Sequence, residues 1–126
     1  MKLEVGSVAP DTSDGSWGVR GRDPVSGLPR EVDLPSHELR QALEEPVVEI
    51  VAAVKDALET TPPELASDIF DRGIVVAGGG GLLRGFPERL SQETNVAVGL
   101  AEDPLTCVAL GAGQALDEIE LLERRW

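Results

Sequence analysis

An apolar segment that ends in four consecutive glycines is the feature that most constrains the fold. Residues 73–77 read Gly-Ile-Val-Val-Ala, and Gly78, Gly79, Gly80 and Gly81 follow directly. A short, unbroken apolar run is typical of a strand covered on both faces. Four glycines remove every Cβ at the strand end, so the backbone there can adopt positive φ angles or let a flat ligand or another main chain approach closely. The sequence therefore predicts a buried strand that ends in an unusual turn.

The segments after the glycines predict a parallel α/β unit. Residues 87–94 favour a helix and residues 96–100 favour a second strand. A strand, a helix and a strand in this order imply two parallel strands joined by a right-handed crossover. A last helix is predicted from residue 105 to about residue 124, with small residues early in it that permit close packing.

Two helices are predicted before the glycine-terminated strand. Apolar residues recur every three or four positions over residues 39–58, which indicates one side of a long helix with Ser36 as its N-cap. Pro46 falls inside this helix, where it removes a backbone hydrogen bond, so we expect a bend or an interruption there. Proline at the first turn favours a short helix from Pro63, and Gly73 is expected to end it in the left-handed conformation.

Residues 1–35 are rich in glycine, proline, aspartate and serine, and they predict a small antiparallel sheet. Short alternating runs lie at residues 3–5, 17–21 and 30–34. Proline and glycine within residues 23–29 are placed for a turn, so the last two runs are expected to form a hairpin.

Composition limits the classes of function that are open to the chain. Its 126 residues, 41% of them apolar, suit one domain with its own core. With 23 acidic against 11 basic residues the formal net charge is −12, which disfavours binding to nucleic acids or anionic lipid surfaces. No run approaches the roughly 20 apolar residues needed to cross a bilayer, and no signal peptide is evident. The single cysteine, Cys107, favours a reducing, cytoplasmic location.

Common phosphate-binding motifs do not explain the glycine run. No Lys-Ser or Lys-Thr follows it, as a Walker A loop requires, and Leu82 and Leu83 stand where a G-x-G-x-x-G motif needs glycine. From these residues alone, a tight strand-to-helix turn remains open as the alternative to a ligand site.

Other candidate residues favour structural roles. His37 is expected at the surface, and Cys107 is expected to be a small buried apolar residue. Asp-Arg-Gly at residues 71–73 is better explained as a helix C-cap than as a phosphate contact.

Several segments in consistent order carry a resemblance to one family. Residues 77–85 read Ala-Gly-Gly-Gly-Gly-Leu-Leu-Arg-Gly, which resembles the adenosine motif T-G-G-G-A-L-L-R-G of the bacterial actin homologue MreB. Further matches lie at residues 62–69, 71–74 and 101–111, and at residues 20–23 with 27–29. The resemblance covers nearly the whole chain, so the protein is identified as a member of the MreB/Mbl family and is similar to its C-terminal portion.

The resemblance implies an α/β fold that is part of the second lobe of the actin-like ATPase (ribonuclease H-like) fold, with a small antiparallel β subdomain. Residues 1–35 would belong to the small upper subdomain, and residues 36–104 to the α/β lower subdomain with the adenosine motif. Residues 105–126 would form a C-terminal helix that crosses toward the first lobe. The phosphate-binding hairpins of that first lobe have no counterpart in this sequence, so the family's ATPase activity is left open for this chain.

The resemblance also implies a binding site. Gly78, Gly79, Gly80 and Gly81 would form a backbone shelf against the adenosine part of ATP, with Leu82 along its edge. No catalytic residue and no metal ligand is carried over. The Mg²⁺ used by the full-length family would not be liganded by this chain.

Two departures from the family motif bear on that site. Ala77 stands where the motif has threonine, and Gly81 stands where it has alanine, which would loosen the start of the following helix. Loss of one neutral hydrogen bond costs about 1 kcal/mol, which is too little to abolish a site. The sequence therefore predicts a shelf that is weaker than usual.

The function implied by the resemblance is ATP-dependent assembly into cytoskeletal filaments that control cell shape and wall synthesis. The partner would be the protein itself, in the cytoplasm and associated with the membrane through the filaments. An alternative is a non-catalytic interaction module that docks a helical, membrane-anchored shape protein of the RodZ type. A third interpretation is a remnant without a stable function.

Overall fold

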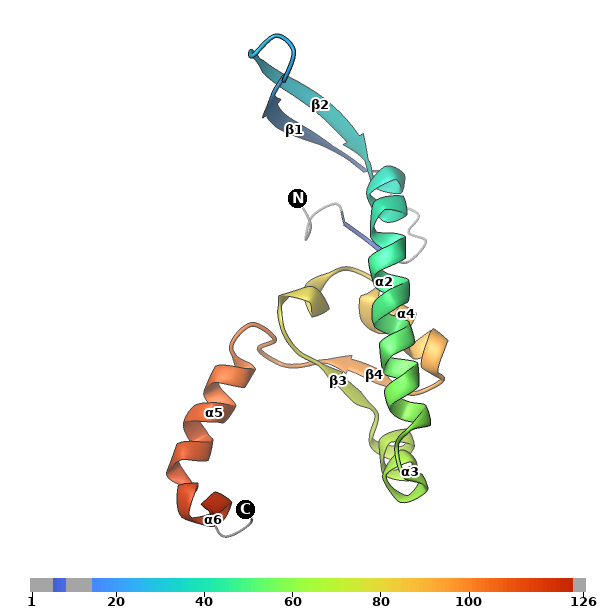
Figure 1. Ribbon diagram of the computed structural model, residues 1–126, viewed down its shortest axis with the longest axis vertical. Coiled ribbons are helices and arrows are strands. Elements are labelled where there is room, and N and C mark those ends of the chain that lie inside the picture. The colour runs from blue at the N-terminus through green and yellow to red at the C-terminus, as the bar shows by residue number, and fades with distance from the viewer. Residues whose placement is uncertain (1–5, 9–14, 124–126) are drawn as a thin grey trace.

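The computed structural model describes residues 6–8 and 15–123. A hairpin projects beyond one end of a long helix, a short parallel strand pair lies at the centre, and the last two helices lie on the side away from the long helix (Figure 1). In chain order the elements are β1 (Ser16–Arg22), β2 (Pro29–Pro35), α2 (Ser36–Glu59), α3 (Pro63–Arg72), β3 (Ile74–Val76), η1 (Gly79–Leu82), α4 (Phe86–Thr94), β4 (Val98–Leu100), α5 (Cys107–Asp117) and α6 (Ile119–Glu123).

The hairpin of β1 and β2 confirms the prediction for this segment. The strands pair antiparallel, and its turn is held by Asp23. The carboxylate of Asp23 accepts the N–H of Val25 at 2.8 Å, and its carbonyl accepts the N–H of Gly27 at 2.8 Å. Gly27 has a φ of 70°, which glycine adopts without strain. The strand predicted at residues 3–5 lies outside the described residues.

The long helix α2 corrects two predictions. It runs unbroken through Pro46, and Figure 1 shows one continuous coil with no sharp bend. Proline removes a single donor, and the buried side chains of Val47 and Val51 anchor the next turns, so the rest of the hydrogen-bond ladder persists. The N-cap is Pro35 and not Ser36, because Ser36 is the first helical residue and its hydroxyl donates to the carbonyl of Gly15 instead.

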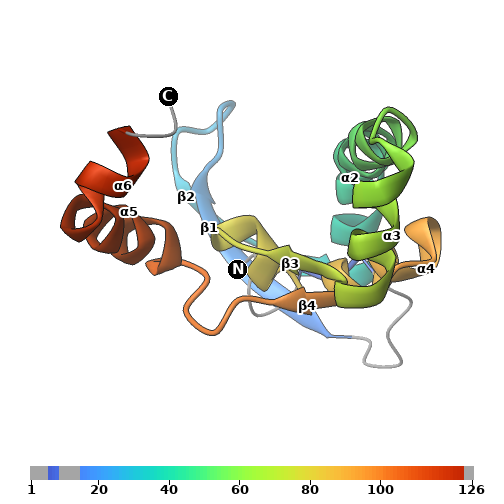
Figure 2. The same cartoon turned by 90° about the horizontal axis from the view of Figure 1, so that it is seen from below.

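The strands β3 and β4 are parallel, as predicted, with Ile74 opposite Val98. One apolar cluster forms the core beside them, made of Val8, Val47, Val51, Phe86 and Leu90. The expectation that β3 is covered on both faces is wrong for the described chain, since the side chain of Val75 is 70% exposed. Figure 2 shows α2, α3 and α4 on one side of the strand pair and α5 on the other.

The helix α3 begins with Pro63 and ends at Gly73, as predicted. The N–H of Gly73 donates to the carbonyl of Ile69 at 2.8 Å. Its φ of 86° is positive, but its ψ of −176° differs from the predicted left-handed helical conformation. A Cβ at this position would lie 2.7 Å from the carbonyl oxygen of Ala97, so the close approach to the chain before β4 requires glycine.

The C-terminal segment differs from the single helix predicted from residue 105. The backbone leaves the helical conformation at Glu118, where φ is −111° and ψ is 24°, and this separates α5 from α6. Of the small residues that permit close packing, Ala109, Ala112 and Gly113 are exposed in the described chain and Ala115 is half-buried. Among the helices of residues 6–8 and 15–123, none is both long and apolar enough to cross a bilayer.

Candidate functional site

The glycine turn, defined here as residues 78–82, begins with a conformation that only glycine adopts readily. Gly78 has a φ of 86° and a ψ of 167°. Its N–H donates to the carbonyl of Pro104 at 2.6 Å, and the N–H of Ala101 donates to the carbonyl of Val76 at 2.9 Å. The chain after β3 is thus tied to the chain after β4, so both strand ends meet at one edge of the molecule.

The next residues form a single 3₁₀ turn whose outer main chain is open. The N–H of Gly81 donates to the carbonyl of Gly78, and that of Leu83 to the carbonyl of Gly80, both at 3.1 Å. Gly79 and Gly80 are exposed. A Cβ at Gly80 would meet no atom within 4 Å, so the main chain here offers a bare surface that side chains do not cover.

The inner half of the turn faces the strands. Gly81 is buried, and a Cβ there would lie 2.8 Å from Cγ1 of Val76 and 2.9 Å from Cδ1 of Leu100. The glycine that departs from the family motif therefore fits a tight contact with β3 and β4. Leu82 is half-buried at the end of η1.

An N-terminal segment lies beside the end of the glycine turn, which the sequence did not predict. Ser7 forms a parallel bridge with Arg84, and the N–H of Val8 donates to the carbonyl of Arg84 at 3.0 Å. The side chain of Val8 is 2% exposed and belongs to the core. Only the tertiary structure brings this segment to the turn, because about 75 residues separate the two in sequence.

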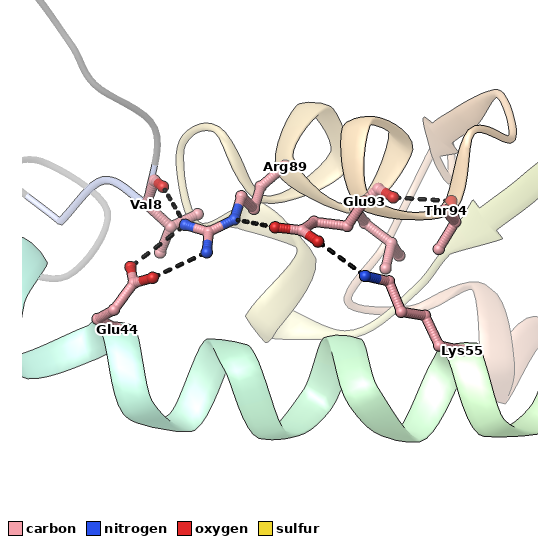
Figure 3. A network of polar contacts seen from close by, with 7 residues as sticks. Val8, Glu44, Lys55, Arg89, Glu93 and Thr94 are labelled. Carbon is pink, nitrogen blue, oxygen red and sulfur yellow. Dashed lines mark hydrogen bonds and ion pairs between the residues drawn. The ribbon is translucent and has the colours of Figure 1, made fainter.

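A row of four charged side chains also escaped the sequence analysis (Figure 3). Arg89 of α4 donates through Nη2 to Oε1 of Glu44 at 2.8 Å and through Nη1 to Oε2 at 3.2 Å. Its Nε donates to Oε1 of Glu93 at 3.4 Å, and Nζ of Lys55 donates to Oε2 of Glu93 at 2.8 Å. The local signal was the i,i+4 spacing of Arg89 and Glu93, but their partners on α2 are distant in sequence.

These contacts set the charge state of the row. The hydrogen bond from Arg89 lowers the pKa of Glu44 below its ordinary value. The hydrogen bond and charge of Lys55 lower the pKa of Glu93, with a further contribution from Arg89. The pKa of Arg89 is raised, first by its hydrogen bond to Glu44. Glu44, Glu93 and Arg89 are therefore ionised at neutral pH.

The other residues singled out in the sequence do not join the glycine turn in a reactive cluster. His37 is exposed on α2, and Asp71 is exposed near the end of α3. Cys107 is half-buried, with Sγ 3.8 Å from the carbonyl oxygen of Pro104. Within the described residues no group of three or more histidine, cysteine, aspartate or glutamate side chains could hold a metal ion.

The geometry suits binding more than bond chemistry. The turn itself consists of four glycines and a leucine, so it carries no nucleophile and no group that exchanges a proton. An exposed main chain without Cβ atoms admits a flat ring at van der Waals distance. The turn therefore presents main chain, and no reactive side chain, to solvent.

Comparison with known proteins agrees with this fold. The family model for the MreB/Mbl protein matches residues 1–124. The chain is 47% identical over 125 residues to the cell shape-determining protein Mbl of Bacillus subtilis, covering 99% of this chain and 38% of that protein. It is 50% identical over 121 residues to the cell shape-determining protein MreB of Escherichia coli, covering 96% of this chain and 35% of that protein.

Solved structures of actin-like proteins resemble this chain in fold. MreB5 of Spiroplasma citri bound to ADP superposes with a TM-score of 0.86 at 35% identity, covering 99% of this chain and 38% of that one. The MamK double helical filament matches with a TM-score of 0.61 at 25% identity, over 82% of this chain and 31% of that one. The chain thus spans about a third of the length of these relatives, and its fold is part of an actin-like fold. The sequence match and the shared architecture show that this chain belongs to the MreB/Mbl family.

Proposed function

We propose that the glycine turn is the adenosine-contacting part of an ATP site in a cytoskeletal protein that assembles into filaments and controls cell shape and wall synthesis. The observation that carries the proposal is the exposed main chain of Gly79 and Gly80 beyond the ends of β3 and β4, where a Cβ at Gly80 would meet no atom within 4 Å and one at Gly79 would meet only the side chain of Leu105, at 3.3 Å. Gly78 and Gly81 shape this shelf, and Leu82 lies along it.

Relatives support the proposal. The structures of MreB5 from Spiroplasma citri are described as bound to ADP and to AMPPNP. The relatives from Bacillus subtilis and Escherichia coli are named cell shape-determining proteins, and MamK is described as a filament. By this reasoning the protein acts in the cytoplasm with copies of itself, and its filaments associate with the membrane. We assign no residue of this chain as a ligand of the Mg²⁺ that accompanies ATP.

The assignment of segments of the chain to subdomains is part of the same proposal. Of residues 1–35, the projecting hairpin belongs to the small upper subdomain, whereas Ser7 and Val8 pack with residues 36–104, the lower subdomain that presents the glycine turn. Residues 105–126 cross toward the first lobe. The exposed apolar side chains of α5 support this assignment, because such a surface suits contact with a further part of the protein.

The test is a titration of the 126-residue protein with ADP, followed residue by residue through its amide resonances. We expect weak binding, with the largest shifts at Gly79, Gly80 and Leu82. The variant Gly80→Ala adds a methyl group to the shelf in otherwise open space, so its fold should be intact while its affinity falls about fivefold, equivalent to ~1 kcal/mol of contact.

Gly21→Ala is the matched control, since a Cβ there also meets no atom within 4 Å and the residue lies in the hairpin. Its ADP affinity should equal that of the unmodified protein. Absence of shifts at millimolar ADP, or shifts that avoid the glycine turn, would overturn the nucleotide role. We also expect no ATP hydrolysis by this chain, and measurable turnover would contradict the absence of reactive groups around the turn.

A second candidate is an interaction module that docks a helical, membrane-anchored partner of the RodZ type. The observation that favours it is the exposure of Leu65 and Phe70 on α3, at 55% and 67%. Phe70→Ser should weaken capture of such a partner's cytoplasmic segment, whereas Gly80→Ala should not. The opposite pattern would exclude α3 as the docking surface.

A further inference from the structure

The contact between α2 and α4 has an apolar part that does not fix its own alignment. Val47 and Val51 of α2 and Phe86 and Leu90 of α4 are buried in one cluster. Burial of apolar surface is favourable but non-directional. Such a contact holds two helices together without deciding how far one is displaced along the other.

The four charged side chains fix the alignment of α4 along α2 that the apolar contact leaves undetermined. At one end Arg89 binds both carboxylate oxygens of Glu44, and at the other end Lys55 binds Glu93 (Figure 3). Lys55 follows Glu44 by 11 residues on α2, which corresponds to about 16 Å along the helix axis at 1.5 Å per residue. On α4 the attached residues, Arg89 and Glu93, are four positions or about 6 Å apart, and they bind two separated points on α2, so together they restrict the sliding of α4 along α2.

The helix α4 is joined to the glycine turn without a flexible linker. The N–H of Leu83 donates to the carbonyl of Gly80, and the N–H of Phe86 donates to the carbonyl of Leu83, both at 3.1 Å. The N–H of Arg89 donates to the carbonyl of Gly85 at 2.9 Å. A displacement of α4 would therefore be passed through consecutive hydrogen bonds to the turn.

Arg89 also reaches the N-terminal segment that lies beside the turn. Its Nη1 is 3.5 Å from the carbonyl oxygen of Val8, whose own N–H donates to the carbonyl of Arg84. The Arg89 side chain is only 21% exposed. One guanidinium thus contacts α2, α4 and the N-terminal segment at the point where the glycine turn leads into α4.

We propose that Arg89 is a positioning residue for the glycine turn. With the carboxylates of Glu44 and Glu93 and the ammonium of Lys55, it fixes α4 on α2 and so decides where the exposed main chain of the turn lies. This inference deepens the nucleotide role proposed above and rests on it only where ADP affinity is the readout.

The experiment measures amide hydrogen exchange in the 126-residue protein without ligand. In Arg89→Met the amides of Gly81 and Leu83 should exchange about threefold faster than in the unmodified protein, a size typical of ion pairs at this exposure. Arg20→Met is the matched control, because it breaks the exposed pair of Arg20 with Glu31 in the hairpin. It should leave exchange in the glycine turn unchanged.

The pattern of exchange separates positioning from general stability. A merely stabilising role would speed exchange of the core amides of α2, α4 and β3 by the same factor as those of the turn, and that result would overturn the proposal. Glu44→Gln removes the charge partner while keeping its shape, so it should reproduce the local effect, and combining it with Arg89→Met should add little. Arg89→Lys, which keeps the charge but not the bidentate contact, should restore part of the protection.

A titration with ADP adds a second readout. If the unmodified protein binds ADP, Arg89→Met should raise the dissociation constant about threefold, and an unchanged constant would overturn the proposal. If the unmodified protein does not bind ADP, the nucleotide role fails, while the exchange pattern still decides whether Arg89 positions the turn.

Discussion

The helices α4 and α5 each follow a strand of the same parallel pair, and both carry large apolar side chains, but the surroundings of these side chains differ. Phe86 and Leu90 of α4 are at most 8% exposed, whereas Val108 and Leu116 of α5 are 70% and 68% exposed. The helix α4 has α2 beside it, while α5 lies on the other side of the strand pair (Figure 2). An apolar pattern thus identifies a face that needs cover, but not whether the described chain supplies it.

The largest expected effect tests this comparison directly. Leu90→Ala removes a side chain that is 3% exposed between α2 and α4, so it should lower the free energy of unfolding by about 2–5 kcal/mol. Urea denaturation followed by circular dichroism measures the change. Leu116→Ala in α5 is the matched control and should change stability by less than about 0.5 kcal/mol. Equal losses in the two variants would show that α5 is covered in solution.

The next effect compares the space around two glycines, one directly before β3 and one in α5. Gly73→Ala places a Cβ 2.7 Å from the carbonyl oxygen of Ala97 at a φ of 86°, so it should cost about 1–3 kcal/mol. Gly111→Ala in α5 meets no atom within 4 Å and should stabilise its helix by up to about 1 kcal/mol. Thermal unfolding should move in opposite directions for the two variants. A common direction would contradict the difference in packing.

The smallest expected effect is a pH dependence of the folding stability, which arises from the ion pairs between α2 and α4. The pKa values of Glu44 and Glu93 are lowered from their ordinary 4.5 in the folded protein, first by the hydrogen bonds from Arg89 and Lys55 respectively. Their contribution to stability is therefore fully present above about pH 4.5 and is lost as pH falls through the lower folded pKa values. Arg89 stays charged throughout this range, since its pKa is raised.

Thermal unfolding between pH 7 and pH 3 would measure this contribution. The difference in midpoint between the unmodified protein and Arg89→Met should be largest near neutral pH and should shrink as the carboxylates become protonated. No ion pair involves the described residues of α5. The difference in unfolding midpoint between the unmodified protein and Leu116→Ala should therefore not depend on pH. A difference for Arg89→Met that grows toward pH 3 would contradict the assigned contacts.

Elements specified by neighbouring residues were predictable. The hairpin, the start of α3 at Pro63 and the end of α3 at Gly73 follow from turn and capping residues that act over a few positions. The parallel pairing of β3 with β4 followed from the order of strand, helix and strand, since the crossover restricts the topology. The motif at residues 77–85 also indicated the family, because its residue order is specific.

Elements that depend on distant partners were predicted less well. The sequence suggested an interruption of α2 at Pro46, but tertiary packing of the flanking turns outweighs one missing hydrogen bond. It suggested one C-terminal helix, which instead breaks at Glu118. The roles of the individual glycines could not be separated either, since the burial of Gly81 depends on Val76 and on Leu100 from the other strand.

The order of residues by itself determined the strand that ends in glycines, the hairpin, the acidic charge and the family, because each of these is a local pattern or a sum over residues. Tertiary structure alone decided that Gly79 and Gly80 face outward while Gly81 faces the strands, and that Arg89 joins Glu44 across the contact between two helices. The physical reason is that burial and ion pairing arise between segments far apart in the chain. Their geometry is set only when the helices pack.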